Sequence, residues 1–287
     1  MAASSQATDV PPDESLGSEE PSLADSKFVK VGTIEGDYRY VSRIKKLSRT
    51  QLIVVTNNGD LYFVSTVDII TRNINISAKV IDAIAMSEDK VIAATVVAGW
   101  FYIRIENDSL NLKQLKFPGP YDNLSYVDGN IVWVMNRKKL VIQTVKGKVN
   151  STSQISVDTA QKVEISISNS QPICNKYISA VQENGNGFIY MTGFAGFNSN
   201  QISKLSLKGQ VVMVYNDWDF LLAGEISATG DGHVFVCFPR ENCIRLVRPD
   251  MKAARTVLDE DDGLLSPAAI CIARKRGDYM FAIRGQA

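Results

Sequence analysis

The feature that most constrains this chain is a repeat of short, strand-like units that start every 40 to 54 residues. Each unit opens with an alternating segment, turns at Gly, Asp or Asn, and continues into a strongly apolar strand and then a third strand. The six opening segments are SRIKKL from residue 42, DAIAMS from 82, NLSYVD from 123, YISAVQ from 177, EISATG from 225 and PAAICIA from 267. A unit of this length with three or four strands is typical of a β-propeller blade.

We therefore predict an all-β fold, a six-bladed β-propeller over residues 27–287. No stretch shows helical periodicity over three turns. Each blade is a small sheet with two apolar faces, and a closed ring buries all of them. The last unit contains only two clear strands, so we expect the strand over residues 28–34 to complete that sheet. A pair of all-β sandwiches is the alternative, but it does not explain the regular order of the strands.

Residues 1–26 differ in composition from the rest, with six acidic residues and no Lys, Arg or aromatic residue. Such a segment cannot bury enough apolar surface to fold, so we predict a disordered acidic leader. Lys+Arg and Asp+Glu number 31 each in the whole chain, which leaves residues 27–287 mildly basic. We find no secretory signal pattern and no apolar run of membrane-spanning length. The four cysteines are sparse, which fits a reducing compartment and a cytoplasmic location.

The residues that most often carry chemistry do not form a recognisable site. His233 is the only histidine, and a zinc site needs three or four ligands, so we assign His233 to a turn. Cys237 and Cys243 flank a predicted turn at Pro239–Glu241, and symmetrical pairing would place them opposite each other as free thiols; a disulfide would need an oxidising compartment. The acidic run over residues 258–263 lacks the register of a calcium loop. We predict no catalytic residue, no metal site and no cofactor.

The fifth unit, GHVFVCFPRENCIRLVRPDMK, and the segment FVKVGTIEGDYRYVSRIKKL resemble the NHL-repeat propellers of the tripartite-motif (TRIM-NHL) family, and the resemblance covers about residues 27–287. Three positions at which NHL repeats usually carry Asp, Asn and Arg hold Phe238, Glu241 and Cys243 here. The resemblance implies recognition of a protein or RNA partner, in relatives often for ubiquitin transfer. The chain has no RING or B-box spacing and no coiled-coil heptads, so it would not itself be a ligase. The apolar framework matches at Val234, Val236, Ile244, Leu246 and Val247.

In a propeller, the turns between second and third strands share one face with the connections that enter each blade. Aromatic and Arg residues on such a rigid face are typical of protein-binding hot spots. We therefore predict a non-enzymatic binding or scaffold module that recognises a protein partner through this face. Trp218 is equally compatible with a core position. The candidate partner-binding residues are Trp100, Arg137, Lys138, Phe194, Phe197, Trp218 and Arg240.

Two alternatives remain. Single-stranded RNA could bind a basic propeller face, as in some NHL propellers, although the aromatic residues here are separated from most of the basic ones. A lactonase-like or lyase-like hydrolase would need polar groups that converge on the central channel. The predicted inner strands offer mostly Ile, Ala and Ser for that purpose, which disfavours the enzyme.

Overall fold

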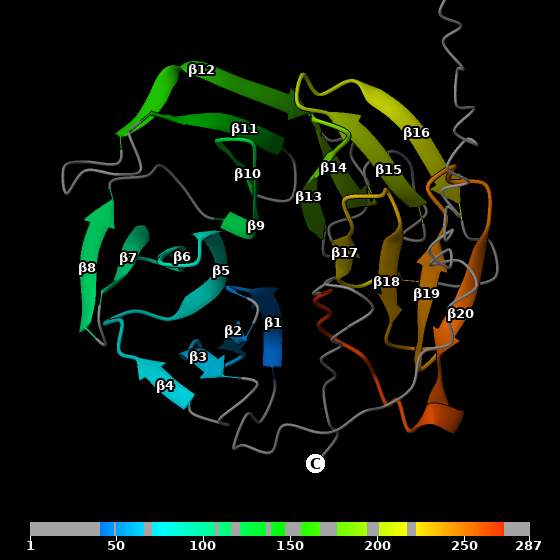
Figure 1. Cartoon of the computed structure of the whole chain (residues 1–287), viewed down its shortest axis with the longest axis horizontal. Helices are drawn as coiled ribbons and strands as arrows, with labels where there is room; N and C mark the ends of the chain where they lie inside the picture. The colour runs from blue at the N-terminus through cyan, green and yellow to red at the C-terminus, as the bar shows by residue number, and fades with distance from the viewer. Residues whose placement is uncertain are drawn as a thin grey trace, which may run out of the picture.

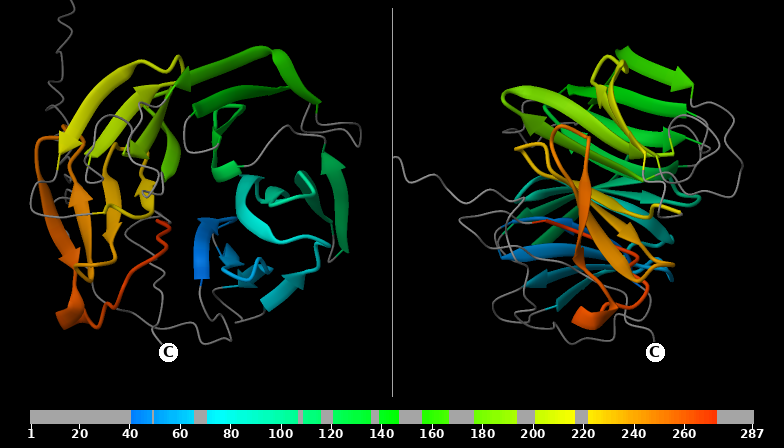
Figure 2. Two further views of the ribbon diagram at one scale, coloured as in Figure 1. Left: turned by 180° about the vertical axis from the view of Figure 1, so that it is seen from behind. Right: turned by 90° about the vertical axis from the view of Figure 1, so that its right-hand side faces the viewer.

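The computed structural model describes residues 41–48, 50–65, 71–106, 109–115, 121–135, 139–146, 156–166, 177–193, 201–216 and 222–272. Within these ranges the chain forms five antiparallel four-stranded sheets, the blades, arranged as a ring (Figure 1). The view from behind shows the same ring (Figure 2). The predicted all-β propeller is confirmed, whereas the predicted leader lies outside the described residues. None of the helical structure in these ranges is long and apolar enough to cross a membrane.

The strands follow the chain order within every blade. Blade one contains β1 (Val41–Lys46), β2 (Gln51–Thr56), β3 (Leu61–Ser65) and β4 (Thr71–Ile74). Blade two contains β5 (Val80–Ser87), β6 (Lys90–Thr95), β7 (Trp100–Glu106) and β8 (Ser109–Leu115). Blade three contains β9 (Tyr121–Val127), β10 (Asn130–Met135), β11 (Lys139–Lys146) and β12 (Ser156–Ser166). Blade four contains β13 (Ile178–Glu183), β14 (Asn186–Thr192), β15 (Gln201–Ser206) and β16 (Val211–Asn216). Blade five contains β17 (Ile226–Ala228), β18 (Val234–Phe238), β19 (Cys243–Val247) and β20 (Ala254–Leu258).

In blades one, two, three and five the second strand is the most buried part. All residues of β6 and β18 are buried, because neighbouring blades cover both faces of these strands. This explains why the second strands read as continuous apolar runs rather than alternating ones. The side chains between blades two and three include Trp100 and Trp133, which meet edge to face with ring centroids 5.2 Å apart. The hydrophobic core of the protein is therefore divided among the junctions between blades.

A recurring hydrogen bond links the innermost strands of successive blades. From blade two to blade four, a side-chain oxygen on each inner strand accepts a backbone N–H from the next inner strand, and the inner strand of blade five accepts one from residue 272 in the same way. The four bonds join Asp82 Oδ2 to the Leu124 amide (2.7 Å), Ser125 Oγ to Ala180 (2.8 Å), Ser179 Oγ to Ala228 (3.0 Å), and Ser227 Oγ to Ile272 (3.3 Å). These inter-blade clasps hold the inner strands in fixed relative positions.

The predicted number of six blades is wrong, because the described residues form five. The segment expected to open a sixth blade, from residue 267, lies within the stretch Leu264–Ile272, which contains no strand. Its extended chain lies instead between blade five and blade one, and we call it the closing segment (Figure 1). Ala269 and Cys271 pack against the core of blade one, whereas Ile270 and Ile272 pack against blade five. One alternating segment thus covers two sheet faces, and the strand predicted over residues 28–34 lies outside the described residues.

The two cysteines of blade five also differ from the prediction. The turn between β18 and β19 has four residues, Pro239–Asn242, with Asn242 in the left-handed region at φ 51°. The longer turn shifts the register by one residue, so Cys237 pairs with Ile244 and Cys243 pairs with Phe238. Because side chains alternate along a strand, the two thiols lie on opposite faces of the sheet. The prediction that they are free and buried is confirmed.

Loss of a clasp should destabilise the ring. We expect Ser179→Ala to lower the free energy of unfolding by about 1 kcal/mol, because the Ala228 amide loses its acceptor. Urea denaturation followed by tryptophan fluorescence measures this change. Ser77→Ala, at an exposed position in the loop before β5, is the matched control and should leave stability unchanged. Equal stability of the two variants would contradict a stabilising role for the clasp.

The buried thiols should react only when the protein opens. Burial raises the pKa of Cys271 to about 12 and raises that of Cys237 well above its ordinary value, so both remain protonated at neutral pH. Since the thiolate is the reactive species, we expect a Cys174→Ser variant to react with a thiol reagent such as dithionitrobenzoate at least about a hundredfold more slowly when folded than in denaturant. Rapid reaction of the folded protein would contradict this burial.

Candidate functional site

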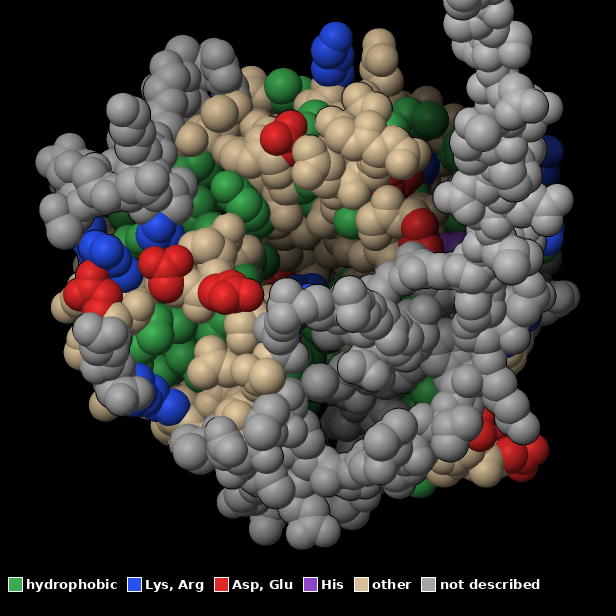
Figure 3. Space-filling model, viewed as in Figure 1, with side chains coloured by type: hydrophobic (Ala, Val, Ile, Leu, Met, Phe, Trp, Pro, Cys, Tyr) green, Lys and Arg blue, Asp and Glu red, His purple; other side chains and the backbone are tan. Residues whose placement is uncertain are grey.

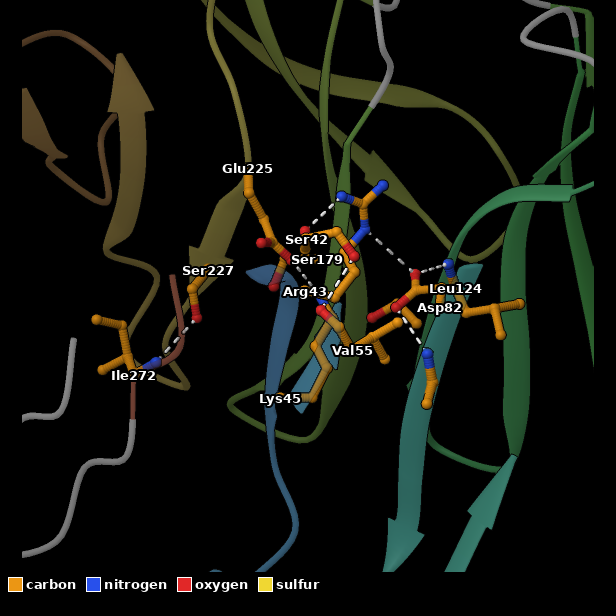
Figure 4. Close-up of polar contacts among 12 residues, drawn as sticks. Ser42, Arg43, Lys45, Val55, Asp82, Leu124, Ser179, Glu225, Ser227 and Ile272 are labelled. Atoms are coloured by element: carbon orange, nitrogen blue, oxygen red, sulfur yellow. Dashed lines mark hydrogen bonds and ion pairs between the residues drawn. The ribbon is translucent and has the colours of Figure 1, made fainter. Parts of the chain in front are cut away.

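Charged side chains gather where the inner strands begin, at the centre of the ring (Figure 4). Arg43 and Lys45 come from β1, Asp82 comes from β5, and Glu225 directly precedes β17. Tyr177 directly precedes β13 and contributes its ring. Arg43, Asp82, Tyr177 and Glu225 lie opposite the last residues of second strands, and Lys45 reaches Glu225 from one step further along β1. The central cluster, as we call these five residues, therefore lies toward the face that carries the turns between second and third strands. We call that face the loop face.

Lys45 and Glu225 form an ion pair across the seam between blade one and blade five. Lys45 Nζ donates to Glu225 Oε1 at 2.7 Å, and the Glu225 side chain is only 1% exposed. Burial raises the pKa of the Glu225 carboxyl, whereas the nearby Lys45 and Arg43 oppose that shift. Burial lowers the pKa of Lys45, but the Glu225 and Asp82 carboxylates outweigh burial and raise it above its ordinary value. The lysine is therefore held as a cation at neutral pH.

Arg43 occupies the middle of the central cluster. Its Nη1 donates to the Ser42 carbonyl at 2.7 Å, and its Nε lies 3.9 Å from Asp82 Oδ2. The guanidinium lies 5.0 Å from the centroid of the Tyr177 ring, in a cation–π arrangement. Asp82 also accepts the Leu124 amide, so this carboxylate serves both the clasp and the central cluster. Arg43 thus connects residues from three blades.

The central cluster contains two cations and two anions that lie close enough to neutralise one another. A buried set of this kind fixes the relative positions of the blades rather than leaving a reactive group exposed. Among the described residues, no three His, Cys, Asp or Glu side chains come together as a metal site. Figure 3 shows one face of the ring, which is hollowed near its middle.

Sequence reasoning missed this central cluster. The expectation that the inner strands offer mostly Ile, Ala and Ser is incomplete, because Arg43 and Glu225 flank apolar–serine pairs, and Lys45 and Asp82 lie on the inner strands β1 and β5 themselves. Glu225 and Tyr177 both stand immediately before an Ile-Ser pair, at Ile226 and Ile178. This shared position is the signal that alignment of the repeat units against one another would have revealed.

The structure places two of the predicted partner-binding residues. Trp100 is fully buried against Trp133 between blades two and three, so its side chain belongs to the core of this structure rather than to its surface. Arg240 is exposed in the turn between β18 and β19, as expected. The other predicted residues, Arg137, Lys138, Phe194, Phe197 and Trp218, lie outside the described residues.

A different feature of the loop face was not predicted. In the turn between β6 and β7, the Val96 residue is 51% exposed and Val97 is 85% exposed. The turn is ordered by Thr95, whose hydroxyl donates to the Gly99 carbonyl at 2.7 Å and accepts the Ala98 amide at 3.1 Å. The backbone is therefore held in a conformation that directs two apolar side chains into solvent.

His233 lies in the turn before β18, as predicted, and its Nδ1 is 3.3 Å from Asp231 Oδ1. The neighbouring junction between blades four and five contains a second buried ion pair, in which Lys204 Nζ lies 2.6 Å from Glu183 Oε2. Tyr190 donates its hydroxyl to the other oxygen of Glu183 at 2.6 Å. Burial raises the pKa of Tyr190, which keeps the hydroxyl protonated as a donor. Both carboxylate oxygens of Glu183 therefore have a partner within this junction.

Comparison with known proteins shows the fold alone. No protein-family model matches the sequence, and no curated protein matches it. A structural genomics protein of unknown function from Bacteroides thetaiotaomicron has a TM-score of 0.60 at 11% identity, over 82% of this chain and 64% of that chain, so this chain spans less than two thirds of that protein. Virginiamycin B lyase from Staphylococcus aureus has a TM-score of 0.54 at 12% identity, over 83% and 76% of the two chains. The WD40 β-propeller domain of Doa1 has a TM-score of 0.51 at 13% identity, over 78% and 70%.

Removal of one partner of the Lys45–Glu225 ion pair should lower the stability of the protein more than removal of both partners. We expect Lys45→Met to lower the free energy of unfolding by roughly 3 kcal/mol, because the buried Glu225 loses its partner. The double variant Lys45→Met/Glu225→Met should recover most of that loss, as two apolar side chains replace the pair. Denaturant titration measures all three proteins. Lys139→Met, which breaks the exposed contact with Glu164, is the control and should change stability by less than about 1 kcal/mol. A double variant no more stable than Lys45→Met would contradict the pairing.

Proposed function

We propose that this chain is a non-enzymatic binding or scaffold module that recognises a protein partner through the loop face of the propeller. The observation that carries the proposal is the ordered turn between β6 and β7 with its exposed Val96 and Val97. Apolar side chains held rigidly in solvent gain nothing within the chain, and their burial by a partner is favourable at little entropic cost. The exposed Arg240 on the same face adds a residue type that is common in binding hot spots.

The central cluster supports a binding role rather than catalysis. Its acids and bases lie beside one another, and Asp82 and Glu225 are both almost fully buried. A general acid or base has to reach the proton of a substrate, and carboxylates used to join blades are poorly placed for that task. The resemblance to the substrate-recognition domains of TRIM-NHL proteins is part of the same proposal. RNA binding through Arg137 and Lys138 stays a prediction.

Replacement of the exposed valine tests the proposal. We expect Val97→Lys to weaken capture of the partner by at least about tenfold, because the interface would have to bury an unpaired charge. Capture from a cell extract with the wild-type chain as bait, followed by mass spectrometry, identifies the partner. Its affinity for wild-type and Val97→Lys proteins is then measured by surface plasmon resonance.

Two controls give the result its meaning. Leu265→Lys introduces the same charge at an exposed apolar residue of the closing segment and should leave binding unchanged. Nuclease treatment of the extract should also leave capture unchanged. Loss of the captured partner after nuclease treatment would instead favour the RNA alternative, and equal affinity of Val97→Lys would contradict a role for the β6–β7 turn.

A further inference from the structure

A lysine is held between two turns of the loop face. Lys79 lies in the connection from β4 to β5, between blades one and two. The Val80 amide donates to the Gly59 carbonyl at 3.0 Å, which links this connection to the β2–β3 turn of blade one. The Val96 amide donates to the Lys79 carbonyl at 3.0 Å, which links it to the β6–β7 turn of blade two. The backbone of Lys79 therefore has a fixed position beside the exposed valines.

The aliphatic stem of Lys79 packs on Gly59. A Cβ atom added to Gly59 would lie 2.3 Å from Lys79 Cγ and 2.8 Å from Lys79 Cα, so only glycine admits the lysine at this place. Gly59 also has a φ of 90°, in the left-handed region that favours glycine. The stem is therefore held, although the lysine as a whole is exposed. Such a lysine loses less side-chain entropy on binding a partner than an unsupported one does.

The ammonium group of Lys79 has no ion-pair partner among the residues that the structure describes. Asp60, in the neighbouring β2–β3 turn, is directed into its own turn, where its Oδ2 accepts the Thr56 hydroxyl at 3.3 Å. The exposed acidic run Glu260–Asp262 follows β20 and belongs to blade five. Blades one and two therefore present an uncompensated positive charge near two exposed apolar side chains.

We propose that Lys79, Val96 and Val97 form one binding site, which takes a protein segment that carries an acidic side chain close to an apolar one. The apolar side chain packs on the valines, and the carboxylate pairs with the Lys79 ammonium group. The same charge selects against segments with a basic residue at that place. This inference rests on the proposed function, because it names the chemistry of the partner that the loop face recognises.

The test selects peptides from a phage-displayed library of random sequences on the immobilised whole chain and on its variants. We expect the wild-type chain to enrich peptides with Asp or Glu close to an apolar residue. Lys79→Glu reverses the charge and should enrich peptides with Lys or Arg in that place. A synthetic peptide from the wild-type selection should bind Lys79→Glu at least about tenfold more weakly than the wild-type chain, as measured by isothermal titration calorimetry.

Two further variants separate the charge from its surroundings. Lys252→Glu carries the same change in the turn between β19 and β20, on the opposite face, and should bind the synthetic peptide as the wild-type chain does. Lys79→Met keeps an aliphatic stem on Gly59 without the charge, so it should still select apolar residues but no longer acidic ones. Circular dichroism checks that every variant is folded.

The outcomes distinguish this inference from the proposed function. Peptides that bind the wild-type chain and Lys79→Glu equally, but not Val97→Lys, would overturn the acidic partner and leave the loop face as a binding surface. Failure of the wild-type chain to enrich any peptide that Val97→Lys loses would overturn both proposals. Binding of a short oligouridine that Lys79→Glu abolishes, without such peptides, would show that the lysine contacts RNA instead.

Discussion

The hydrogen bond from an inner-strand side chain to the next inner strand is the interaction on which the ring depends. Burial of apolar faces draws the blades together, but it is non-directional and leaves them free to slide. The bonds to Leu124, Ala180 and Ala228 fix β9, β13 and β17 against the inner strand before each, and the bond to Ile272 fixes the closing segment against β17. The central cluster and the turns of the loop face lie close to these bonds, so the bonds also hold them in fixed positions.

Much of the fold could be predicted from the repeat, because strand periodicity and turn residues are local properties of the chain. The starts of β1, β5, β9, β13 and β17 fall within a residue or two of the predicted units. The number of blades could not be predicted in the same way. PAAICIA has the alternating pattern of a first strand, but whether it pairs depends on a neighbour distant in sequence, and pattern alone does not report that neighbour.

The pairing register of β18 and β19 was predicted wrongly, and the central cluster was not predicted at all, for related reasons. One extra residue in a turn moves Cys237 and Cys243 to opposite faces, and turn length is weakly encoded in Pro239–Asn242. Arg43, Asp82 and Glu225 come from three units far apart in sequence, and each alone reads as an ordinary surface charge. The sequence also did not predict which apolar side chains are exposed, since Trp100 is buried and Val97, three residues away, is exposed.

The closing segment has a consequence for synthesis of the protein. Blade one leaves the ribosome early, yet part of its apolar face, including Val41, Ile44 and Val54, is covered by Ala269 and Cys271. Among the described residues, these two side chains that cover it are made only after the four following blades. The nascent chain is therefore a natural client for chaperones that bind apolar surface, and a chain interrupted before residue 264 would keep this face open to aggregation.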